Sequence, residues 1–296
     1  MNPYIIQIIN LIGINAIMAV SLNLVTGHTG QFSLGHAGFM AIGAYASAAF
    51  SVYGQSILLP YLLHIPGGVG VGIYFVLALL FGGTLAAIAG FCVGLPSLRL
   101  RGDYLAIVTL GFGEIIRVIV LNIDFVGGAR GFGDIPEYAN FFWIYLILIL
   151  VILCVANLVR SLKGKAFLAI REDEVAAQSI GIDTTQYKVK AFVIGSFWAG
   201  VGGGLFAHLN TYLHTNSFGF LKSVEFVVMV VLGGMGSITG SLVSAALLTV
   251  MPEVLRVASE WRMIIYALLL IVLMILRPRG LLRKKELSWF MSKRNK

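Results

Sequence analysis

Long apolar stretches dominate this chain of 296 residues and restrict its fold more than any other feature. The stretch at 69–93, for example, contains no charged residue. The hydrocarbon core of a bilayer is about 30 Å thick, so about 20 consecutive apolar residues span it as an α-helix. Strands of a membrane barrel would alternate apolar and polar residues, which these stretches do not. With 11% charged residues and a mean hydropathy of +0.93, the chain is predicted to be an all-α, polytopic transmembrane bundle.

The hydropathy pattern predicts about 8–10 spans in one integral membrane domain at 1–280, followed by a basic tail at 281–296. The first stretch lacks the basic flank and the small-residue cleavage site of a signal peptide, so we expect it to be retained as a span. Residues 57–65 are a further candidate for an interfacial or re-entrant segment. Nine expected spans lie at 5–25, 31–52, 69–93, 104–122, 139–159, 191–209, 223–236, 238–251 and 261–276.

Glycine is abundant, with 35 residues, and several glycines interrupt the apolar stretches. GHTGQFSLGHAG (27–38) and LGGMGSITGS (232–241) occupy corresponding places in the two halves of the chain, which hints at an internal repeat with glycine-broken helices. Such glycines allow close packing of helices in lipid. Alternatively, broken helices line a solute pathway. Gly233, Gly234 and Gly236 are therefore candidates for a translocation pathway.

One polar segment, at 159–190, interrupts the apolar pattern with ten charged residues. Residues 172–180 within it are expected to form a short helix with Val175, Ala176 and Ile180 toward one side. Gly181 follows where a helix C-terminus favours a residue that can adopt positive φ. A short helix on the face of a membrane protein can bind a soluble partner, and the simpler alternative is a solvated connector.

The distribution of Lys and Arg predicts the orientation in the membrane. The chain from residue 277 to 296 contains eight basic residues and one acidic residue, so we expect the C-terminus to be cytoplasmic. Alternation of the spans then places the polar segment 159–190 on the cytoplasmic side, together with Arg99 and Arg101. Anionic lipid accounts for the net charge of +8, and a nucleic-acid partner is not needed.

Few polar side chains lie inside the expected spans. A charge at the bilayer centre costs on the order of 2.5–3.5 kcal/mol by insertion scales, so Glu114 and Arg117 should face protein or water. They are three residues apart and can pair with each other, or they can line or gate a pathway. Ser33 and His36 can contact a solute, or His36 can make a hydrogen bond that packs two helices.

Several functional motifs are absent from the sequence. The Gly164-Lys165 pair has Val159 where a phosphate-binding loop requires its first glycine, so the chain is not expected to bind ATP. No arginine ladder of a voltage sensor and no potassium-channel filter is present. The histidines and the two cysteines lack the spacing of metal ligands. The sequence also shows no pattern of a nucleophile and a base that would indicate an enzyme. We therefore expect no metal, no cofactor and no catalytic residue in this chain.

Four motifs in order carry a resemblance to a known family. LRLRGDYLAIVTLGFGE (98–114) resembles the signature of LivM-type permeases, the membrane subunits of branched-chain amino acid ABC transporters. The other three blocks are similar to SLNLVTGHTGQFSLGHAGFMAIGAY (21–45), AIREDEVAAQSIGID followed by YKVKAFVIG (169–195), and MVVLGGMGSITGSLVSAA (229–246). The resemblance extends over about residues 10–285 and therefore includes almost the whole chain.

This resemblance implies a permease subunit in the cytoplasmic membrane of a bacterium or archaeon. Its partners would be a second, LivH-type permease, two cytoplasmic ATPases that hold ATP and Mg²⁺, and an extracytoplasmic amino-acid-binding protein. The polar segment would be the loop that couples the permease to the ATPases, although the usual Ile-x-Leu-Pro is replaced by QYKVK at 186–190. The expected coupling residues are Arg171, Glu172, Asp173, Glu174, Ala176, Ala177 and Gly181.

Two classes of function remain open from the sequence. The favoured class is an ATP-driven importer subunit for branched-chain or related hydrophobic amino acids, although relatives carry urea or other small polar solutes. The alternative is a self-sufficient secondary transporter or channel, which needs an ion site inside the bundle, and Glu114 is the one candidate for it.

Overall fold

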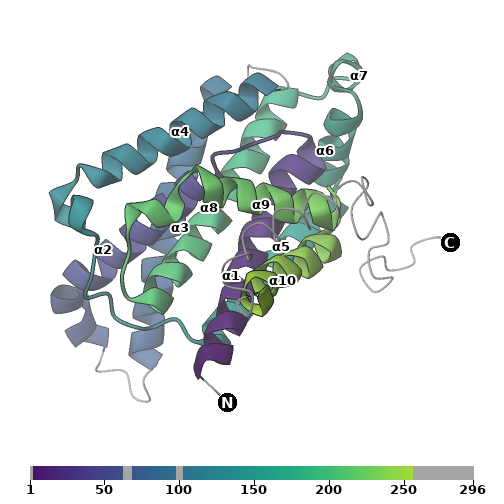
Figure 1. Ribbon diagram of the computed structural model, residues 1–296. Coiled ribbons are helices and arrows are strands. Elements are labelled where there is room, and N and C mark those ends of the chain that lie inside the picture. The colour runs from purple at the N-terminus through teal and green to yellow at the C-terminus, as the bar shows by residue number, and fades with distance from the viewer. Residues whose placement is uncertain (1–2, 63–68, 98–102, 256–296) are drawn as a thin grey trace.

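The computed structural model describes residues 3–62, 69–97 and 103–255 (Figure 1). Within these ranges, an isolated antiparallel bridge between Phe132 and Leu213 is the one β element. The longer helices are α1 (Pro3–Asn23), α2 (His36–Leu62), α3 (Val69–Ser97), α4 (Asp103–Leu121), α5 (Phe141–Arg160), α6 (Leu162–Glu172), α8 (Thr184–Asn210), α9 (Phe220–Gly233) and α10 (Ile238–Val254). The shorter elements are α7 (Glu174–Ser179), a π-helix η1 (Leu24–His28), and the 3-10 turns η3 (Asp124–Val126), η4 (Gly128–Arg130) and η5 (Thr215–Phe218).

The helical bundle agrees with the fold predicted from the apolar stretches. Seven described segments are long and apolar enough to cross a membrane: α1 with η1, α2, α3, α4, α5, α8, and η5 with α9. The eighth predicted span corresponds to α10, which has 17 residues and is shorter. The ninth, at 261–276, and the tail at 281–296 lie outside the described residues.

The boundaries predicted for 57–65 and for 191–209 are wrong. The candidate segment at 57–65 is not a separate element as far as residue 62, because α2 continues to Leu62. The span predicted at 191–209 begins at Thr184, because the side chain of Asp183 accepts a hydrogen bond from the backbone N–H of Gln186 and caps α8 there. Lys188 and Lys190 thus lie in the first two turns of a spanning helix.

α2, α3 and α8 form the most closely packed part of the bundle. A Cβ added to Gly43 in α2 would overlap the backbone of Gly200 in α8, and one added to Gly200 would overlap Ala86 in α3. Small residues allow this close approach of backbones in lipid, where helix association depends on packing. Glycine therefore lies where these three helices meet.

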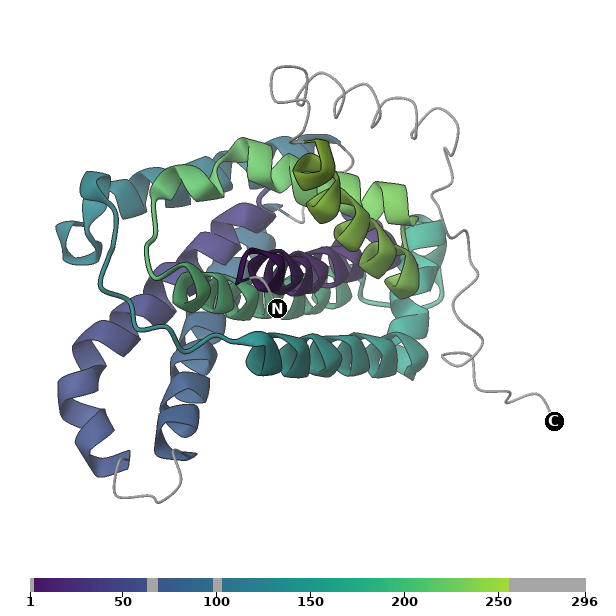
Figure 2. The same ribbon diagram turned by 60° about the horizontal axis from the view of Figure 1, so that its bottom comes forward.

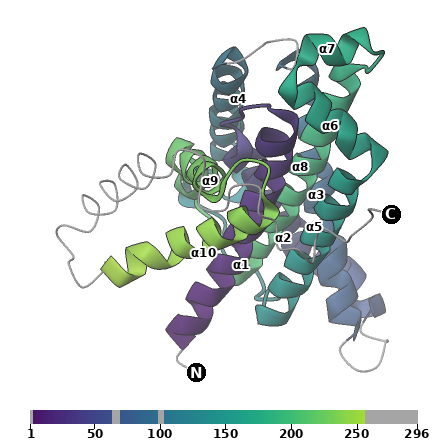
Figure 3. The same ribbon diagram turned by 90° about the vertical axis from the view of Figure 1, so that its right-hand side faces the viewer.

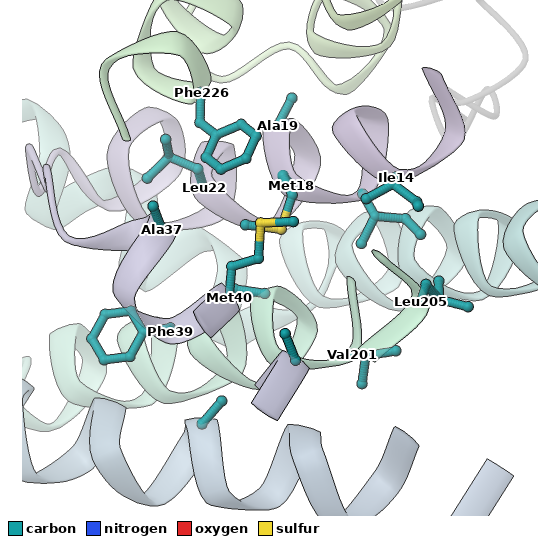
Figure 4. Close-up of a cluster of buried hydrophobic side chains, with 14 of the residues drawn as sticks. Ile14, Met18, Ala19, Leu22, Ala37, Phe39, Met40, Val201, Leu205 and Phe226 are labelled. Atoms are coloured by element: carbon teal, nitrogen blue, oxygen red, sulfur yellow. The ribbon is translucent and has the colours of Figure 1, made fainter. Parts of the chain in front are cut away.

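α1 lies in the middle of the molecule, between α5 and α8 on one side and α9 and α10 on the other (Figure 2). Its side chains Ile14, Met18 and Leu22 are buried against α2, α8 and α9, as the close-up of the core shows (Figure 4). α10 runs antiparallel to α1, because Asn15 donates to Thr249 at 2.8 Å and Tyr4 bonds Glu253. Polar contacts thus hold α10 to a central helix.

The backbone between η1 and α2 leaves the helical conformation, which delays the start of the span predicted at 31–52. Gly30 has φ +73, and the backbone N–H of Leu34 donates to Thr109 Oγ1 in α4 at 3.0 Å. Gly35 packs directly against the carbonyl of Thr109. Irregular backbone survives at membrane depth where protein groups satisfy it. The break therefore depends on α4.

Candidate coupling segment and translocation pathway

The polar segment 159–190 folds into α6, α7 and the start of α8, which project together at one end of the bundle (Figure 3). The expected single helix at 172–180 is wrong at its N-terminus, because α6 ends at Glu172 and α7 begins at Glu174. Asp173 between them is extended, with φ −155 and ψ 111, and its carboxylate accepts from the N–H groups of Val175 and Ala176. Asp173 therefore acts as the N-cap of α7.

Apolar side chains are exposed in α7 and at its C-cap residue Ile180. Val175 and Ile180 are 59% and 75% exposed, and Ala176 is exposed beside them. Ala177 is different, because only 2% of its surface is accessible and it faces the body of the protein. Ala177 therefore positions α7 and cannot itself form the surface that a partner contacts.

Gly181 ends α7 in the conformation that the sequence predicted. Its φ is +88, which is strained for a residue with a side chain. A Cβ added there would have no heavy atom within 4 Å, so space is not what requires glycine. The direction of the chain after α7 thus depends on the backbone conformation of Gly181.

An ion pair holds α7 to the start of α8. Lys188 Nζ lies 2.7 Å from Glu174 Oε1, and the side chain of Lys188 is only 10% exposed. Gln178 Nε2 donates to Thr184 Oγ1 at 2.8 Å, which adds a second bond between the same helices. An ion pair that is mostly buried is costly to break on one side. Movement of α7 is therefore linked to α8.

Arg171, in the last turn of α6, points inward. Its Nη1 donates to the carbonyl of Gly27 in η1 at 2.9 Å, and its Nε and Nη2 donate to Glu172 Oε1 at 3.3 and 2.6 Å. The side chain of Glu172 is 73% exposed, whereas that of Arg171 is 27% exposed. Of these two expected coupling residues, Glu172 therefore faces solvent, whereas Arg171 points into the protein.

The predicted pathway residues Ser33 and His36 are both buried. Their exposures are 1% and 2%, and His36 Nε2 lies 2.8 Å from Ser21 Oγ in α1. The hydroxyl of Ser21 donates to the carbonyl of Met18, so it can accept from the imidazole. This geometry is the helix-packing hydrogen bond that was the alternative for His36.

Glu114 and Arg117 form the ion pair that their spacing predicted. Arg117 Nε donates to Glu114 Oε2 at 2.7 Å, and their side chains are 28% and 35% exposed, respectively. Gly111 lies three residues earlier, and a Cβ added there would have nothing within 4 Å. This part of α4 therefore has an open side that carries two charges.

The three candidate glycines near the end of α9 have different environments. Gly233 packs against the backbone of Gly240, whereas Gly234 and Gly236 have φ +102 and +85 in the turn between α9 and α10. Asn23 Oδ1 accepts from the N–H of Gly236 at 2.8 Å, and its Nδ2 donates to the carbonyl of Ser237 at 3.0 Å. The two glycine-rich segments that suggested a repeat thus meet each other, and the repeat itself stays a prediction.

Asn23 is the site residue that sequence reasoning missed. The signal for it was a polar side chain near the end of the first apolar stretch, four residues before Gly27. Among the described residues, no group of His, Cys, Asp and Glu could hold a metal ion. A cavity of about 900 Å³ lies between α3, α5, the start of α6 and α8, but none of the pathway candidates lines it.

Comparisons with known proteins confirm the resemblance carried by the four sequence motifs. A family model described as branched-chain amino acid transport system / permease component matches residues 4–276. The high-affinity branched-chain amino acid transport system permease protein LivM of Escherichia coli (strain K12) is 37% identical over 94% of this chain and 69% of its own length. LivM of Salmonella typhimurium (strain LT2) is also 37% identical, over 90% of this chain and 67% of its own length.

The same comparisons include a second type of permease. The permease protein LivH of Escherichia coli (strain K12) is 30% identical over 49% of this chain and 48% of its own length. No solved structure matches the chain significantly. The match of the family model extends from α1 to beyond α10 and includes the polar segment and both glycine-rich segments. The chain therefore belongs to the family of permease components of branched-chain amino acid transport systems.

Proposed function

We propose that this chain is one membrane-spanning subunit of an ABC importer that carries branched-chain amino acids into the cell. The observation that carries the proposal is the family match over residues 4–276, and the similarity to the relatives named LivM and LivH supports it. The full sequence contains no phosphate-binding loop. ATP hydrolysis therefore belongs to separate ATPase subunits, which hold ATP and Mg²⁺, and this chain transmits their motion.

The ATPase binds to the exposed side of α7. Val175 and Ile180 are apolar side chains that are more than half exposed on a segment outside the spans, which suits burial in a groove of a soluble partner. The capped turn at Asp173 and the Glu174–Lys188 ion pair fix α7 to the rest of the protein. A short, fixed helix with an exposed apolar side can transmit motion to the spans.

A second, LivH-type permease packs against α4, and the solute passes along this contact. An ion pair within a span is unfavourable against lipid because each charge costs on the order of 2.5–3.5 kcal/mol by insertion scales. The partly exposed Glu114–Arg117 pair is therefore better suited to face protein or water. The open space at Gly111 allows a helix of the partner to approach closely.

The polar segment and the C-terminus face the cytoplasm in this proposal, and a binding protein delivers the amino acid from the opposite side. α10 ends beside Tyr4 at the N-terminal end of α1, away from α6 and α7. The span that the hydropathy pattern predicts at 261–276, outside the described residues, would bring the basic tail to the side of α7, in agreement with the excess of Lys and Arg in both segments.

Reconstitution in proteoliposomes tests this function. The purified chain alone should neither hydrolyse ATP nor concentrate leucine. Both activities should occur when the second permease, the ATPases and a leucine-loaded binding protein are present. Leucine uptake by the lone chain in a sodium or proton gradient would contradict the proposal and favour a self-sufficient carrier.

A further inference from the structure

We propose that Arg171 is a positioning residue that links the coupling segment to two irregular segments of the bundle, η1 at Gly27 and the α9–α10 turn at Gly236. Arg171 lies in the polar segment that the proposed function connects with the ATPase, but its guanidinium points into the protein. The proposal therefore gives it a role inside the permease. This role rests on the function proposed above, because a link of this kind matters only if α7 is moved by a partner.

Three glycines surround the Arg171 side chain. Nη1 donates to the Gly27 carbonyl at 2.9 Å. A Cβ added to Gly236 would lie 2.8 Å from the same Nη1, and a Cβ added to Gly30 would lie 3.2 Å from Arg171 Cγ. The guanidinium therefore lies between η1 and the α9–α10 turn, in space that exists because both segments have glycine there.

The chemistry of the contact makes it strong. Gly27 belongs to the last turn of the continuous helix formed by α1 and η1, where carbonyls lack helical partners and the helix dipole is negative. A guanidinium at that position gives a charge-assisted hydrogen bond, which is about twice as strong as a neutral one. Glu172 occupies Nε and Nη2 and thereby directs Nη1 toward Gly27.

Asn23, the last residue of α1, extends the link from η1 to α9 and α10. Its amide bonds both Gly236 and Ser237, so the end of α1 and the α9–α10 turn are joined directly beside Arg171. Both segments that Arg171 reaches are irregular: one is a π-helix, and the other contains two glycines with positive φ. Such places can bend with less strain than a regular helix. A displacement of α6 and α7 would thus reach α1, α9 and α10 together.

The alternative role for Arg171 is a static one, in which it only holds α6 in place. α6 has other contacts for that purpose, since Phe167 and Ile170 are buried at 1% and 4% exposure. A purely static residue would affect the amount of folded complex, whereas a linking residue would affect how much solute moves per ATP. These two readouts can be measured separately in the same preparation.

The test uses the complete complex of both permeases, the ATPases and the binding protein in proteoliposomes, with leucine as the solute. Arg171→Met removes the donor and the charge, and Lys165→Met removes an exposed charge from the same helix as the matched control. We expect both variants to assemble normally. We expect the amount of leucine transported per ATP hydrolysed to fall about tenfold in Arg171→Met, because the variant loses one hydrogen bond from a charged group. The same amount should stay unchanged in Lys165→Met.

Two further variants keep the proposal falsifiable if Arg171→Met does not assemble. Gly236→Ala places a methyl group against Arg171 Nη1 and should also lower the leucine transported per ATP hydrolysed. Its effect should not add to that of Arg171→Met in the double variant, because both changes act on one contact. Arg171→Lys keeps the charge and should retain more coupling than Arg171→Met.

Three outcomes would overturn the proposal. The first is an equal amount of leucine transported per ATP hydrolysed in Arg171→Met and in Lys165→Met. The second is a loss of ATPase subunits from the Arg171→Met complex, which would make Arg171 a docking residue. The third is failure of all Arg171 and Gly236 variants to assemble, which would make the contact static. A wild-type complex without ATP-driven uptake would instead refute the proposed function itself.

Discussion

Replacing the two exposed apolar side chains of α7 should weaken the attachment of the ATPase without changing the fold of the permease. Full burial of a Val or Ile side chain contributes about 1.5–3 kcal/mol. Val175 and Ile180 are 59% and 75% exposed, so burial of these exposed fractions in an ATPase groove contributes about 2–4 kcal/mol together. The double variant Val175→Ser with Ile180→Ser should therefore raise the Kd for the ATPase roughly 30- to 1,000-fold.

The assay is a titration of ATPase subunits against the two-permease complex in mild detergent, with bound ATPase quantified after size-exclusion chromatography. Leu221→Ser is the matched control, because Leu221 is 82% exposed and lies at the start of α9, away from α7. It should leave the Kd unchanged. Equal Kd values for the double variant and for the Leu221 control would show that α7 does not dock, and the polar segment would then be a solvated connector.

The other predictions concern the turn after α7, the orientation and the α4 ion pair. Gly181→Val should lower uptake and substrate-stimulated ATP hydrolysis together in a complex of normal composition, because φ +88 costs a β-branched residue roughly 1–2 kcal/mol or more and redirects the chain; normal rates would refute a role for this turn. Cysteines at Ser179 and Ser288 should resist an impermeant external thiol reagent in intact cells, and labelling of either from outside would reverse the proposed orientation. Exchange of Glu114 and Arg117 should preserve assembly and lower leucine uptake if the pair lines the pathway; normal uptake would reduce it to structural pairing.

Local sequence rules predicted the features of the fold that depend on neighbouring residues in the chain. Uninterrupted apolar length predicted the spanning helices, because satisfying the backbone within lipid requires a helix of that length. The positive φ of Gly181 followed from its place at the end of one short helix. The Glu114–Arg117 pair followed from a spacing of three residues on α4.

The features that sequence rules did not predict depend on which helices meet. The inward direction of Arg171 needs η1 beside α6, and the role of Asn23 needs the α9–α10 turn beside the end of α1. Ala177 belonged to a helix correctly expected near residues 172–180, but its burial is decided by packing against the protein body. For His36, the sequence left two alternatives, and Ser21 in α1 decides between them.

The glycine contacts among α2, α3 and α8 limit where the molecule can change shape. Backbone rests on backbone at Gly43 and Gly200, so these helices cannot approach further, and a solute cannot pass between them without separating three spans at once. We therefore expect these three helices to keep their relative positions, as a stationary frame, during a transport cycle. We expect the moving elements to be α1 and α9, which contact α2 through side-chain hydrogen bonds, and α10, which is bonded to α1. Spin labels on α2 and α8 should keep a constant separation through ATP binding and hydrolysis, while a label on α10 changes its distance to both.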